Sequence, residues 1–114
     1  MRPEERDLAY LWDMRQAARE ITAFMLGTAY AKFEQDKILR YAVERQLLVI
    51  GEAAAHVSRE FQEQHPEVPW VQIIGQRNVL AHEYGEILVE RIWLTATKSL
   101  PDLLENLEKL VPEK

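Results

Sequence analysis

The chain has 114 residues, of which 47% are hydrophobic and 29% charged, a composition typical of soluble globular proteins. Its formal net charge of −5 argues against nucleic-acid binding through a broad positive surface, so any such contact must be local. The absence of cysteine excludes disulfides and thiolate zinc sites. The length predicts a single domain over residues 1–114.

The N-terminal segment lacks the apolar core of a signal peptide. No apolar run in the sequence approaches the roughly 20 residues that a membrane span requires. We therefore expect a cytoplasmic protein that does not enter a membrane.

Apolar residues recur at three- and four-residue spacing along most of the chain, a pattern that predicts amphipathic helices. The first predicted helix runs from Pro3 to Leu26, just before Gly27. The second begins near Asp36, a plausible N-cap, and ends before His65-Pro66. Its centre is apolar nearly all round, so we expect this long helix to lie in the middle of the fold.

Two more helices follow in the second half of the chain. A shorter one starts after Pro69-Trp70 and closes at Tyr84-Gly85, and the last covers residues 88–110. Pro101 should bend or restart this last helix. Four helices around one core predict an all-α, up-and-down four-helix bundle with its last helix kinked at Pro101. In such a bundle Gly51 would allow a close helix contact.

The segment 76–85 gathers a fixed cation, an amide, an imidazole and a phenol in Arg77, Asn78, His82 and Tyr84. On an ideal helix Arg77 and His82 lie about 140° apart around the axis, so one helix alone does not aim them at one point. The helix could end near Ala81 and swing His82 round, or a second copy of the chain could contribute across a symmetric interface. We favour both together.

Arginine and histidine suit the cleavage of an RNA phosphodiester bond. Imidazole can accept the 2′-hydroxyl proton, and its protonated form can protonate the leaving oxygen. Guanidinium can hold the extra charge of the phosphorane through two phosphate oxygens, and no metal is required. From spacing alone, however, an Arg and a His near a helix end are more often a surface charge and a partner of the helix dipole.

The string Arg77-x-x-x-x-His82-x-Tyr84 resembles the signature of HEPN toxins of the HepT type, which are paired with minimal nucleotidyltransferase antitoxins. Three further blocks resemble this family in the same order, so that the likeness covers nearly the whole chain. They are Arg6-Asp7-x-x-Tyr10-Leu11, Ile50-Gly51-Glu52-Ala53 and Pro69-Trp70-x-x-Ile73-x-Gly75-x-Arg77-Asn78. Gln76 departs from the family, which commonly has an apolar residue there.

The resemblance implies a homodimeric four-helix bundle with a metal-independent RNA-cleaving site at the subunit interface. Residue by residue, it implies that Arg77 and His82 are catalytic and that Asn78 is a supporting polar residue. Tyr84 would be the tyrosine to which the partner nucleotidyltransferase transfers AMP, which silences the toxin. The implied partners are RNA and the antitoxin, in a larger hetero-oligomer, and no cofactor is implied.

Other polar and aromatic residues leave alternatives open. Glu52 lies in an apolar helix centre, so we expect it to be paired with a buried Arg or with hydrogen-bond donors, while a role in orienting Arg77 or His82 is a second possibility. His56 and His65 have no partner at metal-ligand spacing. Four cations could form a local basic surface, although such residues are more often solvated or ion-paired: Arg15, Lys37, Arg40 and Arg45. The three tryptophans are expected to anchor the core or an interface rather than to stack on bases: Trp12, Trp70 and Trp93.

The sequence therefore predicts an endoribonuclease toxin of a type VII-like toxin–antitoxin module, acting on RNA with tRNA as one candidate. A non-catalytic helical module that binds a nucleotidyltransferase is the alternative, and the acidic net charge favours it. A third idea, that the chain is itself the antitoxin, ranks last because the sequence lacks the Gly-Ser loop and paired aspartates of nucleotide transfer.

Overall fold

The computed structural model describes the backbone of residues 3–82 and 85–112, and the side chains of residues 4–80 and 88–112. Throughout these backbone ranges the ordered elements are helices, as the all-α prediction requires. They are α1 (Pro3–Met25), α2 (Tyr30–Gln35), α3 (Lys37–His56), α4 (Arg59–Gln64), α5 (Trp70–His82), α6 (Gly85–Leu94), a π-helical turn η1 (Thr95–Ser99) and α7 (Leu100–Leu110).

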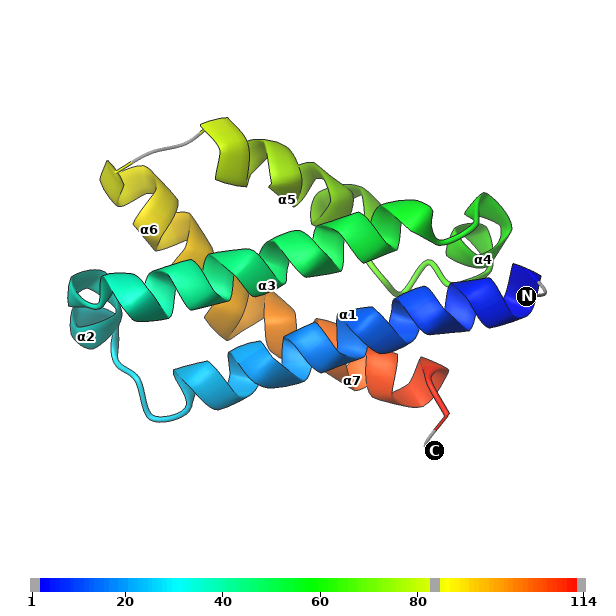
Figure 1. Cartoon of the computed structure of the whole chain (residues 1–114), viewed down its shortest axis with the longest axis horizontal. Helices are drawn as coiled ribbons and strands as arrows, with labels where there is room; N and C mark the ends of the chain where they lie inside the picture. Colours follow the sequence, from blue (N-terminus) through cyan, green and yellow to red (C-terminus); the bar gives the residue numbers. More distant parts are fainter. Residues whose placement is uncertain (1–2, 83–84, 113–114) are drawn as a thin grey trace.

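The helices form the up-and-down bundle that the sequence predicts. α3 runs through the middle, with α1 packed along one side of it and α5 along the other (Figure 1). α6, η1 and α7 make the fourth rod, and α7 packs against α1. The start of α1 and the end of α7 lie at the same end of the bundle (Figure 1). No helix in the described ranges combines the length and the apolar character needed to cross a membrane.

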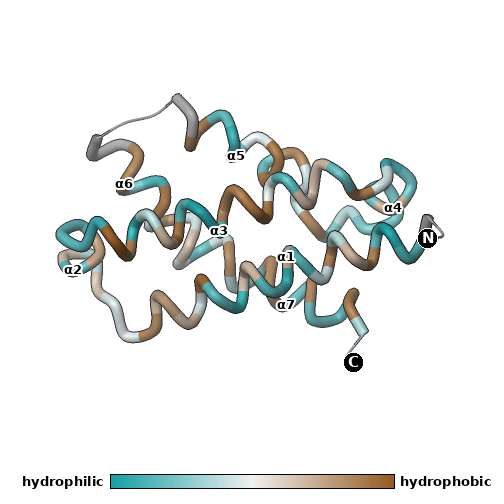
Figure 2. Tube along the Cα trace, in the orientation of Figure 1, coloured by the Kyte–Doolittle hydropathy of each residue, from teal (hydrophilic) through white to brown (hydrophobic). Residues whose placement is uncertain are grey.

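The core fills the space between these rods, and α3 carries a strongly hydrophobic stretch at its centre (Figure 2). Trp70 is buried and donates its indole N–H to the His65 carbonyl oxygen at 3.0 Å, so it anchors the start of α5 as expected. Trp12 and Trp93 are partly buried against the core. The largest fully buried side chains are Phe33, Leu11, Met14, Ile21, Ile92, Leu100, Leu107, Val43 and Val68.

The predicted boundaries around the first turn of the chain are confirmed. α1 ends at Met25, and Gly27 follows with a φ of 71°, a left-handed conformation that glycine adopts without steric cost. Asp36 caps α3, because its side chain accepts a hydrogen bond from the Leu39 backbone N–H at 3.0 Å. That bond lowers the pKa of the Asp36 carboxyl.

The prediction of one unbroken second helix up to His65 is wrong. α3 ends at His56, Val57 is extended, and Ser58 caps a separate short helix, α4. The break is held by Asp7 of α1, which accepts hydrogen bonds from the Ser58 backbone N–H at 2.8 Å and from its hydroxyl at 2.7 Å. The chain turns at Ser58 because of a carboxylate 51 residues away in sequence.

Asp7→Ala is therefore expected to destabilise the protein. The substitution leaves the Ser58 backbone N–H without its charged acceptor, a loss of about 1–3 kcal/mol in the free energy of unfolding. Urea unfolding of the variant checks this value, with Glu20→Ala, an exposed carboxylate on the same helix, as the control. Equal stabilities of the two variants would contradict a structural role for Asp7.

The irregularity expected at Pro101 is present and has a definite form. α6 continues into the π-helical turn η1, and α7 then starts with Pro101 in its first turn. Proline has no backbone N–H and its ring clashes with the carbonyl one turn earlier, so the preceding turn widens rather than continuing as regular α-helix. The fourth rod is thus restarted ahead of Pro101.

Candidate active site

The candidate site lies where α5 crosses α3. A Cβ atom built on Gly51 would lie 3.0 Å from the Arg77 Cγ and 3.3 Å from the Ile73 carbonyl oxygen, so glycine is what lets α5 approach this closely. The aliphatic stem of Arg77 rests on the surface that the missing side chain leaves open. This confirms the close helix contact predicted at Gly51 and places Arg77 at its centre.

The guanidinium group of Arg77 contacts the next residue of α3. Its Nη1 donates to Oε1 of Glu52 at 3.1 Å. The expectation that Glu52 has an Arg partner is confirmed, but the expected burial is wrong, because the side chains of Arg77 and Glu52 are 40% and 56% exposed. Both charged groups of the pair therefore remain accessible to solvent.

The other motif residues are described to different extents. Asn78 is exposed, and as the next residue after Arg77 it points about 100° away around α5. His82 is the last residue of α5, while the side chain of His82 and the whole of Tyr84 lie outside the described residues. Their roles, and that of Asn78, stay predictions.

Two shallow hollows flank this part of α3. One, of about 260 Å³, lies between α1 and α3, and its lining includes Tyr10, Arg45, Glu52 and His56. The other, of about 280 Å³, lies between α3 and α5, and Arg45 lines it too, together with Leu80. The exposed side chain of Arg45 thus lines both hollows, and the first of them also includes Glu52, the partner of Arg77.

The ring contact within the first hollow was not predicted from the sequence. The rings of Tyr10 and His56 stack with centroids 5.2 Å apart. The available signal was spacing, since His56 follows Glu52 by four residues and so lies on the same face of α3.

In the second hollow, burial raises the pKa of the Glu44 carboxyl, and the nearby charge of Arg40 acts in the opposite direction.

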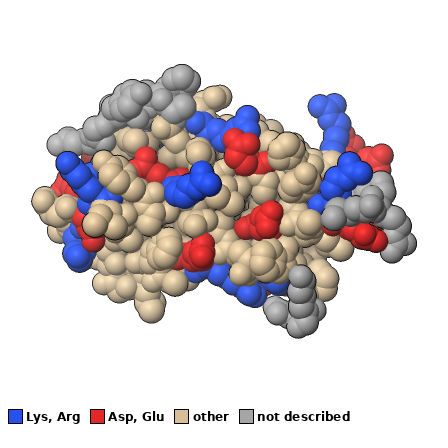
Figure 3. Space-filling model, viewed as in Figure 1, with Lys and Arg blue, Asp and Glu red and all other residues tan. Residues whose placement is uncertain are grey.

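The four candidate cations of a basic surface separate into different roles. Lys37 and Arg45 are exposed, whereas Arg40 donates to the Glu34 carbonyl oxygen. Figure 3 shows lysine and arginine scattered among acidic side chains on one face of the molecule, with no broad positive area. A local rather than extended contact with an anionic ligand agrees with this distribution.

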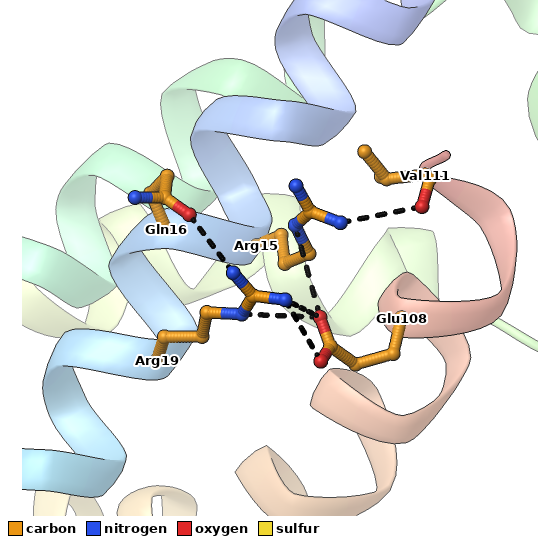
Figure 4. Close-up of polar contacts among 5 residues, drawn as sticks. All are labelled: Arg15, Gln16, Arg19, Glu108 and Val111. Atoms are coloured by element: carbon orange, nitrogen blue, oxygen red, sulfur yellow. Dashed lines mark hydrogen bonds and ion pairs between the residues drawn. The ribbon is translucent and has the colours of Figure 1, made fainter. Parts of the chain in front are cut away.

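Arg15 does not belong to any such surface, and of the two possibilities that the sequence left open for it, ion pairing is the one confirmed. It is 2% exposed, donates to the Val111 carbonyl oxygen at 3.2 Å and lies 3.7 Å from Glu108 (Figure 4). Arg19 holds the same carboxylate from the adjacent turn of α1. Arg15 interrupts the apolar stripe of α1 because it ties α1 to the end of α7.

Comparison with known proteins gives one consistent result. Residues 14–110 match the model of a family described as "Ribonuclease HepT-like". A protein of Thermococcus cleftensis named "Probable ribonuclease HepT" is 35% identical over 101 residues, which cover 89% of this chain and 92% of the relative. A protein of Methanocaldococcus jannaschii named "Putative RNase MJ1380" is 34% identical over 105 residues, which cover 91% of this chain and 96% of the relative. No solved structure gives a significant match.

Proposed function

Since the chain belongs to the HepT-like ribonuclease family, we propose that it is a metal-independent endoribonuclease whose catalytic residues are Arg77 and His82. The observation that carries the proposal is the placement of Arg77. Its stem packs on Gly51 and its guanidinium is held by Glu52, yet 40% of the side chain remains exposed to a ligand. The side chain is thus held in one place and is still accessible to an anionic ligand.

The proposed reaction is an intramolecular transfer at phosphorus. Neutral His82 accepts the proton of the 2′-hydroxyl, whose oxygen forms a bond to phosphorus while the bond to the 5′-oxygen breaks. A protonated imidazole returns the proton to that leaving oxygen, and Arg77 holds the charge that develops on the non-bridging oxygens. The products are a 2′,3′-cyclic phosphate and a 5′-hydroxyl end.

We further propose that the working site needs two copies of the chain. Arg77 and His82 are five positions apart, which places them about 140° apart around a regular helix such as α5. A two-fold axis would bring the arginine of one protomer to the histidine of the other. Asn78, exposed on the same helix, would be a supporting polar residue of this site.

The test is cleavage of total cellular RNA, with tRNA as one candidate substrate, by the purified protein in the presence of a chelator. Variants at Arg77 and His82, purified alongside, exclude a contaminating nuclease. Discrete products with cyclic phosphate ends from the wild type alone are the expected result. Cleavage that requires added metal, or that persists in the variants, would contradict the proposal.

We propose that the protein is the toxin of a cytoplasmic two-gene module and that a minimal nucleotidyltransferase silences it by transferring AMP to Tyr84. Tyr84 lies two residues beyond His82, so phosphate and adenine attached there would block RNA and offer Arg77 a competing anion. Coexpression with such an enzyme should add one or more AMP masses to the intact protein. The matched Tyr84→Phe variant should stay unmodified, and an unmodified wild type would remove this part of the proposal.

The second candidate function is a non-catalytic helical module that binds the nucleotidyltransferase. The net charge of −5 favours it, because that charge opposes RNA binding at long range. It predicts a stable complex with the partner and no RNA cleavage by the unmodified wild type.

A further inference from the structure

Arg77 is held at two points along its length although its side chain is partly exposed. Near the backbone, its Cγ and Cδ face Gly51, where a Cβ atom would lie 3.0 and 3.5 Å from them. At its tip, Nη1 donates to Oε1 of Glu52 at 3.1 Å. Gly51 and Glu52 are consecutive residues of α3, so one helical segment fixes both ends of the arginine.

Stability does not explain this arrangement. An ion pair between side chains as exposed as these contributes about 0–1 kcal/mol, and ordering a long arginine opposes even that gain. The main effect of this ion pair is therefore to fix the position of the Arg77 guanidinium group, and its contribution to the stability of the fold is small.

The contact also leaves Arg77 able to bind a second anion. The hydrogen bond joins one guanidinium nitrogen to one carboxylate oxygen, and the guanidinium group has five N–H donors. Arg19 provides the contrast: its Nε and Nη2 both donate to Glu108, and Nη2 reaches both carboxylate oxygens, at 2.7 and 2.9 Å (Figure 4). Arg19 therefore directs two of its nitrogens to one carboxylate. The single hydrogen bond of Arg77 orients its guanidinium group and leaves other N–H donors for a phosphate.

We propose that Glu52 is a positioning residue, which orients the Arg77 guanidinium so that its remaining donors meet the scissile phosphate. The inference rests on the proposed ribonuclease function and deepens it. Glu52 touches neither RNA nor the reacting atoms. It acts through Arg77, by restricting the orientation of a side chain that would otherwise sample many rotamers.

Two substitutions of Glu52 separate positioning from charge. Glu52→Ala removes the acceptor, and kcat for cleavage of a defined RNA should fall about 10- to 100-fold, with a much smaller change in KM. Glu52→Gln keeps an oxygen that accepts from Nη1, and most of kcat should return. Glu105→Ala is the matched control, because Glu105 is an exposed carboxylate paired with Lys109 on α7 and its loss changes the net charge equally.

Three outcomes would overturn the inference, and a fourth would instead bear on the proposed function. Wild-type kcat in Glu52→Ala, or a higher kcat in both Glu52 variants, would overturn the inference, the second because it would show the carboxylate competing with phosphate for Arg77. A kcat loss accompanied by an equal loss of folded protein at the assay temperature would assign Glu52 a structural role and overturn it too. Absence of cleavage by both wild type and Glu105→Ala would contradict the proposed function instead.

A measurement that needs no activity keeps the inference testable in that last case. Nitrogen-15 relaxation of the Arg77 Nε–H group reports the motion of its side chain on the picosecond to nanosecond scale. Motion should increase in Glu52→Ala and stay at the wild-type level in Glu105→Ala. Equal motion in all three proteins would show that Glu52 does not restrain Arg77.

Discussion

Replacement of Arg77 or His82 by alanine is expected to reduce kcat/KM for RNA cleavage by at least about a hundredfold. Removal of a single donor that stabilises transition-state charge costs about 10²–10³ in rate, and loss of a general acid or base costs about 10²–10⁴. Arg77 is partly exposed on α5, so its removal takes little from the core and should leave the protein folded. Cleavage of a labelled RNA under single-turnover conditions measures the effect directly.

Arg77→Lys is the informative companion of the alanine variants. It keeps the positive charge but loses the planar fork that can bind two phosphate oxygens together. We expect kcat/KM to lie between those of the wild type and Arg77→Ala. Wild-type activity in either alanine variant, with circular dichroism showing the same helix content, would remove that residue from the catalytic pair.

Phe33→Ala is expected to cause a large loss in the free energy of unfolding. Phe33 is 0% exposed and its ring lies 5.5 Å from that of Trp93, so it joins α2 to α6. Truncation of a buried phenylalanine to alanine costs about 3–5 kcal/mol, because transfer energy is lost and a cavity remains. Urea unfolding followed by tryptophan fluorescence measures it.

Phe24→Ala supplies the matched control, since it makes the same chemical change on α1 at a side chain that is 37% exposed. Its loss of unfolding free energy should be clearly smaller. A small loss for Phe33→Ala would mean that the segment 30–35 is not docked as described, because an undocked phenylalanine has little burial to lose.

The short helix α2 illustrates one limit of the sequence prediction. The prediction left residues 27–35 between two helices without an element of their own. Six residues are too few to display helical periodicity, and an isolated helix of that length is not stable in water. α2 exists because Phe33 is buried against the core, which a sequence pattern does not reveal.

Polar residues in apolar surroundings illustrate another limit. Arg15 and Glu52 both interrupt apolar helix stretches, and in both cases the extent of burial differs from what the sequence pattern predicted. Arg15 was a candidate for a basic surface and is buried, whereas Glu52 was expected to be buried and is 56% exposed. Periodicity indicates the face on which a residue lies, but burial depends on which other helix covers that face.

The helical class, the cap at Asp36, the turn at Gly27 and the motif of Arg77, His82 and Tyr84 could all be predicted from the sequence, because propensity, capping and motif spacing are local properties of the chain. The packing of the helices sets the break of the second helix at Ser58, which depends on Asp7 of α1. It also places Arg77 on Gly51 beside the carboxylate of Glu52. These features depend on contacts between residues at least 25 positions apart, and such contacts exist only once the helices have packed.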